Sequence, residues 1–145
     1  MYKRLSLAVL AGMLAVGAAQ AGEKDLVKYR RNQMEVIGGH MNSAAAILKS
    51  EVPYKADLAY HADGIAAAAP NVLPAFETKA MSSKSDALPE IWDKWAEFEK
   101  AAKTFETASA DFSKAAAGGE MAAVGAALGE LGKSCKGCHD DFMDD

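Results

Sequence analysis

Residues 91–116 read IWDKWAEFEKAAKTFETASADFSKAA, and their apolar side chains recur at alternating steps of four and three residues. This spacing follows the 3.6-residue turn of an α-helix, so the apolar side chains line one helix face. Pro89 precedes the segment and suits a first helical turn, whereas Gly118 and Gly119 follow it and suit a helix end. We therefore predict an amphipathic helix whose inward face contains Ile91, Trp95, Phe98, Ala102, Phe105, Ser109, Phe112 and Ala116.

Three further segments have the same periodicity. They span about Asp25 to Ser50, Lys55 to Pro70 and Met121 to Phe142, and a loop with Pro74 and several serines leads from Pro70 to Pro89. No segment alternates with period two, so we predict no strands. The chain is thus expected to be all-α and to form an antiparallel four-helix bundle. In the first helix, the predicted inward face contains Leu26, Arg30, Met34, Ile37, Met41, Ala45 and Leu48.

Length and composition support this fold class and exclude several functions. The chain has 145 residues, enough for one domain, and a formal net charge of −4. Basic residues form no runs, so nucleic acids and anionic membranes are poor candidates for partners. Alanine is abundant and β-branched residues are few, which favours helices. The sequence has no Ser/His/Asp set, phosphate-binding loop or carboxylate pair, so we expect a protein that is not an enzyme.

The N-terminal residues have the layout of a secretory signal peptide. A short basic start, Met1–Arg4, precedes an almost entirely apolar run over 5–19, and Ala19-Gln20-Ala21 has the small-x-small pattern of a cleavage site. The apolar run is shorter than the ~20 residues of a membrane span. We predict cleavage after Ala21 and a mature domain of residues 22–145 in the periplasm, without a membrane span.

The segment Cys135-Lys136-Gly137-Cys138-His139 has the form C-x-x-C-H, the attachment motif of c-type haem. Two thiols must add to the two vinyl groups of one porphyrin, and one helical turn supplies the separation. The next side chain can then offer a ring nitrogen to the iron as proximal ligand. Both cysteines lie on the inward stripe of the fourth helix. We therefore expect one covalent haem c inside the bundle, held by Cys135 and Cys138, with His139 bound to its iron.

The two cysteines allow three other interpretations. A thioredoxin-type dithiol belongs near a βαβ pattern, which the sequence lacks. A structural zinc site needs a fourth ligand, and the chain has no cysteine besides these two. Two buried core thiols would not explain why C-x-x-C-H occurs in a chain with a signal peptide. Covalent haem c accounts for the export signal, the helical pattern and the motif together.

A helical bundle with C-x-x-C-H near its C-terminus resembles the class II c-type cytochromes, a family that includes cytochrome c′. The resemblance covers nearly the whole mature chain, and Gly132–Asp140 around the cysteines is its most specific part. Members often carry Arg or Lys four residues after the haem histidine, whereas this chain has Met143. Other segments also match the family in the right order and spacing, although each is weak evidence alone. They are Tyr29-Arg30, Met34, Pro53-Tyr54 and Pro89-Glu90-Ile91-Trp92.

The resemblance assigns roles to two residues of the first helix. Low-spin members of the family use a methionine as the second iron ligand, and the matching residue here is Met34. Methionine is also a common core filler, and some cytochromes c′ do not ligate iron through this position. Met41 is a more distant candidate ligand. Arg30 is expected to pair with a haem propionate; the alternative is a side chain whose charged head reaches solvent.

Three functions are compatible with these observations. We favour a periplasmic electron carrier whose haem iron passes single electrons to redox partner proteins. The close alternative is a five-coordinate cytochrome c′ that binds nitric oxide or carbon monoxide, and the third is a metal-binding or helical interaction protein. The sequence leaves open whether the chain is a monomer or a homodimer. We predict that Trp92 and Trp95 fill the core or cover the haem edge, and that His40 and His61, which lie beside their apolar stripes, have surface roles.

Overall fold

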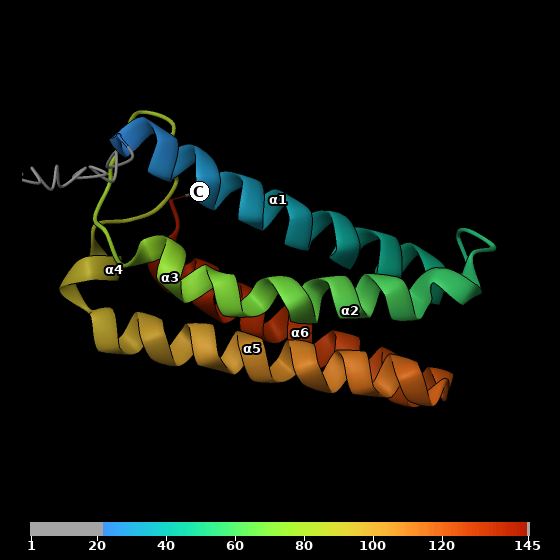
Figure 1. Cartoon of the computed structure of the whole chain (residues 1–145). Coiled ribbons are helices and arrows are strands. Elements are labelled where there is room, and N and C mark those ends of the chain that lie inside the picture. Colours follow the sequence, from blue (N-terminus) through green and yellow to red (C-terminus); the bar gives the residue numbers. More distant parts are fainter. Residues whose placement is uncertain (1–21, 145) are drawn as a thin grey trace, which may run out of the picture.

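Helical segments that run alternately up and down lie side by side in the computed structural model, which describes residues 22–144 (Figure 1). The first segment is α1 (Glu23–Leu48) and the last is α6 (Met121–Phe142). Because α1 packs along α2, α2 along α5 and α5 along α6, the segments close into a bundle. The predicted all-α, antiparallel four-helix bundle is therefore confirmed.

The second and third segments are each built from shorter pieces. The second contains a 3₁₀ turn (Lys55–Asp57), α2 (Leu58–Ala68), another 3₁₀ turn (Ala69–Asn71) and α3 (Val72–Phe76). The third contains α4 (Glu90–Asp93) and α5 (Trp95–Gly118). The start of α1, α3, α4 and the end of α6 all lie at one end of the bundle (Figure 1).

The second helix, α2, ends at Ala68, just before Pro70 as predicted, but the chain then continues in helical turns to Phe76 instead of entering a loop. Pro70 lies in the first turn of a 3₁₀ helix, and Pro74 is the third residue of α3. At these positions a backbone N–H has no partner within its own helix, so proline removes no hydrogen bond. The continuation buries Val72 and Phe76, which the sequence analysis had placed in a loop.

A single helix was predicted for the third segment, but Lys94 divides it into two helices, α4 and α5. Lys94 has φ −121° and ψ 44°, which lie outside the helical region. Its backbone N–H still bonds to the Glu90 carbonyl at 2.8 Å, so α4 closes before α5 begins. The apolar periodicity survives this break, since Ile91 and Phe98 on either side of it are both buried.

The turn between α5 and α6 has a well-defined cap on each side. Gly119 adopts a left-handed φ of 72° and ends α5, as the sequence predicted. Glu120 then caps α6, because its carboxylate accepts hydrogen bonds from the backbone N–H groups of Ala122 and Ala123 at 3.2 and 2.7 Å. A negative side chain here also faces the positive end of the helix dipole.

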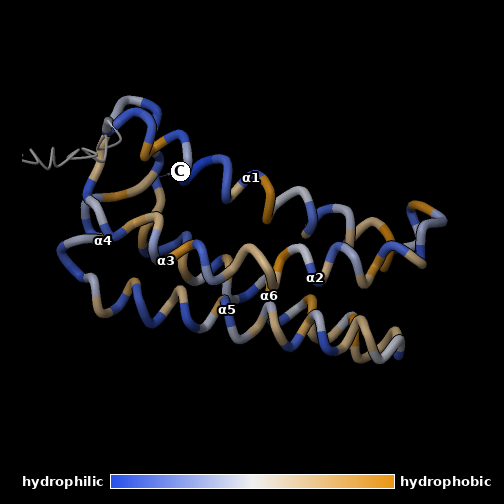
Figure 2. Tube along the Cα trace, viewed as in Figure 1, coloured by the Kyte–Doolittle hydropathy of each residue, from blue (hydrophilic) through white to orange (hydrophobic). Residues whose placement is uncertain are grey.

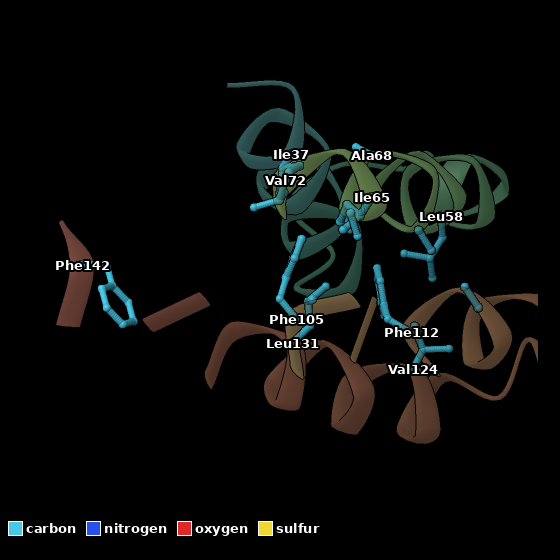
Figure 3. Close-up of a cluster of buried hydrophobic side chains, with 14 of the residues drawn as sticks. Ile37, Leu58, Ile65, Ala68, Val72, Phe105, Phe112, Val124, Leu131 and Phe142 are labelled. Atoms are coloured by element: carbon cyan, nitrogen blue, oxygen red, sulfur yellow. The ribbon is translucent and has the colours of Figure 1, made fainter. Parts of the chain in front are cut away.

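The core lies along the bundle axis, where side chains from α1, α2, α5 and α6 meet (Figure 3). Apolar and polar residues alternate along each helix, as Figure 2 shows. All predicted inward positions within residues 91–116 are buried except Trp95, which is half-buried. In α1 the buried positions include Val27, Ala44 and Ile47, so the predicted stripe is off by one residue at both ends. The reason is that α1 packs mainly against α2 and α3 rather than α6.

The predicted signal peptide, residues 1–21, lies outside the described residues. Within residues 22–144, no helix combines the length and the apolar character that crossing a membrane requires. The β pairing in this part of the chain is limited to one bridge between Ala87 and Met143. That bridge ties the connection before α4 to the C-terminus.

Candidate functional site

A cavity of about 280 Å³ opens at the end of the bundle where α1 begins and α6 ends. Four of the five predicted site residues line it: Arg30 and Met34 from α1, and Cys138 and His139 from α6. Apolar side chains form most of the remaining wall. They are Val27, Val72, Phe76, Ala87, Ile91, Phe98, Phe142 and Met143.

The C-x-x-C-H motif occupies the last turns of α6, as predicted. Cys135 and Cys138 are free thiols, both half-buried and packed against the core. Burial raises the pKa of both thiols, and burial together with the charges of Cys135 and Asp141 raises the pKa of Cys138 to about 11. His139 lines the cavity yet is exposed to solvent, so its imidazole lies at the cavity surface rather than inside the core.

Arg30 is a buried cation at the cavity wall. Only 3% of the residue is exposed, so the alternative that its head reaches solvent is wrong. Its Nη2 donates a hydrogen bond to the Ala80 carbonyl, and its guanidinium lies 4.9 Å from the ring centre of Phe76 and 5.3 Å from that of Trp92. Burial lowers the pKa of Arg30. Its Nη1 is buried without a hydrogen-bond partner, so the site has a cation with an unsatisfied donor.

The two methionines of α1 that were considered as iron ligands lie in different surroundings. Met34 lines the cavity, and it is half-buried. Met41 is absent from the cavity lining and lies against Gly132 of α6, where a β-carbon would be 3.5 Å from its Cε. The structure therefore brings Met34, but not Met41, to the same cavity as His139.

Hydrogen bonds between distant segments fix the cavity wall. Trp92 donates its indole N–H to the Phe76 carbonyl at 2.7 Å, which joins α4 to α3. Leu88 donates its backbone N–H to the Phe142 carbonyl at 3.0 Å, which joins the connection before α4 to the end of α6. The cavity thus has walls from elements that are far apart in the sequence.

These residues fit haem c. Two thiols one helical turn apart, a neighbouring imidazole and a mostly apolar cavity are what a covalent porphyrin needs. The unsatisfied N–H of Arg30 suits a carboxylate, which a porphyrin carries as propionate. The zinc alternative is not supported, because no group of three or more His, Cys, Asp and Glu side chains in residues 22–144 is arranged to hold a metal ion.

Part of this site was not predicted from the sequence. Val72 and Phe76 form cavity wall, although they were expected in a loop. The available signal was that Val72 and Phe76, which both follow Pro70, are four residues apart, a spacing that places them on one helix face. His40 and His61, for which a surface role was predicted, are both half-buried, in a region away from the cavity.

Comparison with known proteins gives consistent matches. The model of the family described as Cytochrome C′ matches residues 25–143. The chain is 36% identical to cytochrome c′ of Pararhodospirillum photometricum over 86% of this chain and all of that protein. It is 33% identical to cytochrome c-556 of Agrobacterium fabrum over 70% of this chain and 68% of that protein.

Solved structures agree. Cytochrome c prime from Shewanella frigidimarina superposes with a TM-score of 0.80 at 28% identity, covering 86% of this chain and 98% of that one. A nitric oxide complex of a variant of cytochrome c prime from Alcaligenes xylosoxidans superposes with a TM-score of 0.79 at 28% identity. The match also covers 86% of this chain and 98% of that one.

Proposed function

Because the chain belongs to the cytochrome c′ family and its cofactor is haem c, we propose that it carries single electrons between redox partner proteins in the periplasm. When bound, the haem supplies an iron that alternates between the ferric and ferrous states. The chain's own residues decide which ligands the iron has and how much water reaches it.

In this proposal, Cys135 and Cys138 hold the haem through thioether bonds and His139 binds the iron. The half-buried positions of both sulfurs support attachment at the inner side of α6. His139 lines the cavity next to Cys138, so its imidazole is available on the cavity side of the helix. Arg30 pairs with a propionate, which would satisfy the buried Nη1 that has no other partner.

One observation carries the electron-carrier function: Met34 and His139 line the same cavity from two different helices. A thioether and an imidazole are the ligand pair of low-spin electron-transfer haems, and the thioether raises the reduction potential. The wall is mostly apolar and includes Phe76 and Phe98, and apolar surroundings limit the solvent reorganisation that accompanies electron transfer. The similarity to a cytochrome c-556 is compatible with such a centre.

The alternative is a five-coordinate haem that binds nitric oxide or carbon monoxide. It is favoured by the similarity to a cytochrome c prime solved as a nitric oxide complex. In this case Met34 would be an apolar wall residue and would leave the distal side of the cavity to a diatomic ligand.

The electronic and magnetic spectra of the oxidised protein distinguish the two functions. We expect a low-spin ferric centre with a sulfur-to-iron charge-transfer band, and a high-spin centre in Met34→Leu. Met41→Leu is the matched control, because Met41 lies on the same helix but not on the cavity, and its spectrum should equal that of the wild type. A high-spin wild type at neutral pH would overturn ligation by Met34 and favour the gas-binding alternative.

We further propose that residues 1–21 are a signal peptide removed during export. Two findings support this. The family match begins at residue 25, and the alignment with cytochrome c′ of Pararhodospirillum photometricum includes all of that protein but only 86% of this chain. Mass spectrometry of the protein from a periplasmic extract should give an N-terminus at Gly22. A mature chain that begins at Met1 would contradict the proposal.

A further inference from the structure

The chain has three histidines, and the two that do not belong to the C-x-x-C-H motif lie together. His40 is on α1 and His61 on α2, and their Nδ1 atoms are 3.1 Å apart. Both side chains are half-buried, so solvent reaches the pair. Packing of α1 against α2 therefore brings these two imidazoles, which are distant in the sequence, into direct contact.

Gly64 provides the space for this contact. A β-carbon at position 64 would lie 2.6 Å from both Cε1 and Nε2 of His40, closer than any real contact of this kind. Glycine inside a helix such as α2 is unfavourable, because the flexible backbone loses more entropy on folding than alanine would. Here it lets the His40 ring lie directly against α2 and turn its Nδ1 toward His61.

An aromatic neighbour further restrains the two rings. Tyr60 packs edge-on against both, with ring centres 5.4 Å from His40 and 5.2 Å from His61. In the part of the chain that the structure describes, neither imidazole bonds to a carboxylate or to the backbone; each has only the other as its polar partner. Each Nδ1 thus faces the other and has no further polar partner in the described residues.

We propose that His40 and His61 bind a divalent transition-metal ion through their Nδ1 atoms, with water in the remaining coordination positions. Metal–imidazole bonds of about 2.0–2.1 Å place two ligand nitrogens roughly 2.9 Å apart at a right angle and roughly 3.3 Å apart at the tetrahedral angle. The observed 3.1 Å lies between these values, so the spacing of the two nitrogens suits a single ion. Neutral imidazole prefers Zn²⁺, Cu²⁺ and Ni²⁺ over Mg²⁺ and Ca²⁺.

The proposed metal site at His40 and His61 is separate from the haem site, and its ion exchanges with solution. His40 follows Met34 by six residues, which is about 9 Å along α1. Two protein ligands cannot enclose an ion, and no group of three or more potential ligands was found in residues 22–144. Without metal, the two nitrogens share one proton in a hydrogen bond, which the ion replaces. The inference does not depend on which function the haem performs.

The test uses the oxidised, haem-loaded protein without an affinity tag. Calorimetric titration with ZnCl₂ should give one ion per chain, and zinc-edge X-ray absorption, which does not detect the haem iron, should show two imidazole nitrogens at about 2.0–2.1 Å. His40→Gln and His61→Gln should each weaken zinc binding at least about tenfold, because loss of a mere outer-shell partner already costs 10–100-fold. MgCl₂ should not bind.

Gly64→Ala is the sharper variant, since it retains both histidines and removes only the space for the His40 ring. We expect it to weaken zinc binding to a similar extent, while Gly125→Ala, where a β-carbon meets nothing within 4 Å, leaves binding unchanged. An unaltered haem spectrum and helical circular dichroism check that each variant is folded. Three outcomes would overturn the proposal. His61→Gln could bind zinc as tightly as the wild type, the bound zinc could have only oxygen ligands, or the wild type could fail to bind zinc at millimolar concentration.

Discussion

Arg30 donates a hydrogen bond from Nη2 to the main-chain carbonyl of Ala80, fifty residues further along the chain. The bond ties α1 to the segment that follows α3, and Ala80 itself is fully buried. The other terminal nitrogen, Nη1, has no partner, although it is equally buried. One side chain thus anchors the connection beside the cavity and leaves a charged donor free for a carboxylate.

We expect Arg30→Gln to lower both the stability and the reduction potential of the haem-loaded protein. Loss of a buried bond to a charged donor should lower the free energy of unfolding by about 1.5–3 kcal/mol. Loss of a positive charge near the iron favours the ferric state, so the potential should fall. Denaturant unfolding and redox titration measure the two effects. Lys28→Gln is the control, because Lys28 is exposed on α1 and does not line the cavity, and it should change stability by no more than about 0.5 kcal/mol.

If Arg30→Gln and Lys28→Gln gave the same potential, Arg30 would have no special relation to the haem. If their stabilities were also equal, the bond to Ala80 would not contribute measurably to the fold. The two readouts separate a propionate partner from a purely structural anchor.

Periodicity predicted most of the fold because each long helix buries one apolar stripe. It was accurate in α5, where Phe105 and Phe112 are buried as expected, since neighbouring helices cover this face evenly. It was less accurate in α1, because its neighbours lie to one side and the sequence does not reveal on which. The ends of helices depend on single backbone groups, so neither the break at Lys94 nor the helical turns through Pro70 followed from the apolar pattern.

The site was predictable where chemistry requires a local motif and not where it depends on tertiary contacts. C-x-x-C-H is contiguous, so the sequence alone located Cys135, Cys138 and His139. The unsatisfied Nη1 of Arg30 and the contact between His40 and His61 arise only when α1 packs on its neighbours. A charged or polar residue next to an apolar stripe does not by itself reveal its partner.

The pair Gly118 and Gly119 offers a test of the turn between α5 and α6. Gly119 has a φ of 72°, which costs a residue with a β-carbon roughly 1–2 kcal/mol, so Gly119→Ala should destabilise the protein by that amount. Gly118 is the last residue of α5, and a β-carbon there meets nothing within 4 Å. Gly118→Ala should therefore leave stability unchanged or raise it by up to about 1 kcal/mol, as measured by thermal unfolding. Equal destabilisation by both substitutions would contradict the left-handed turn.

The two tryptophans differ in one hydrogen bond. Trp92 donates its indole N–H to the Phe76 carbonyl at 2.7 Å, whereas no such bond joins Trp95 to the described part of the chain. Trp92→Phe and Trp95→Phe remove the same atoms, but only the former leaves a carbonyl without its donor. We expect Trp92→Phe to cost about 1 kcal/mol more in the free energy of unfolding. Chemical denaturation of both variants measures this difference, and a difference of zero would show that the bond adds no stability.

The last prediction concerns the reactivity of the thiols before haem is attached. A thiol reacts as its thiolate, and burial raises the pKa of the Cys138 thiol from 9.0 to about 11. At pH 8 the thiolate is then on the order of a hundred times scarcer in the folded chain than in the unfolded chain. Alkylation of Cys138 by iodoacetamide should be slower by a similar factor in the folded, haem-free protein than in urea.

The pH profile provides the internal check. The alkylation rate in urea should level off above pH 9, whereas the rate in the folded chain should keep rising until about pH 11, because each follows its own thiolate fraction. Mass spectrometry after proteolysis distinguishes Cys138 from Cys135, and Cys135→Ser removes the neighbouring charge that contributes to the shift. Identical profiles with and without urea would contradict a buried Cys138. The expected profiles imply that the Cys138 thiolate is scarcer in the folded chain than in the unfolded chain, because α6 packs into the bundle and buries the sulfur.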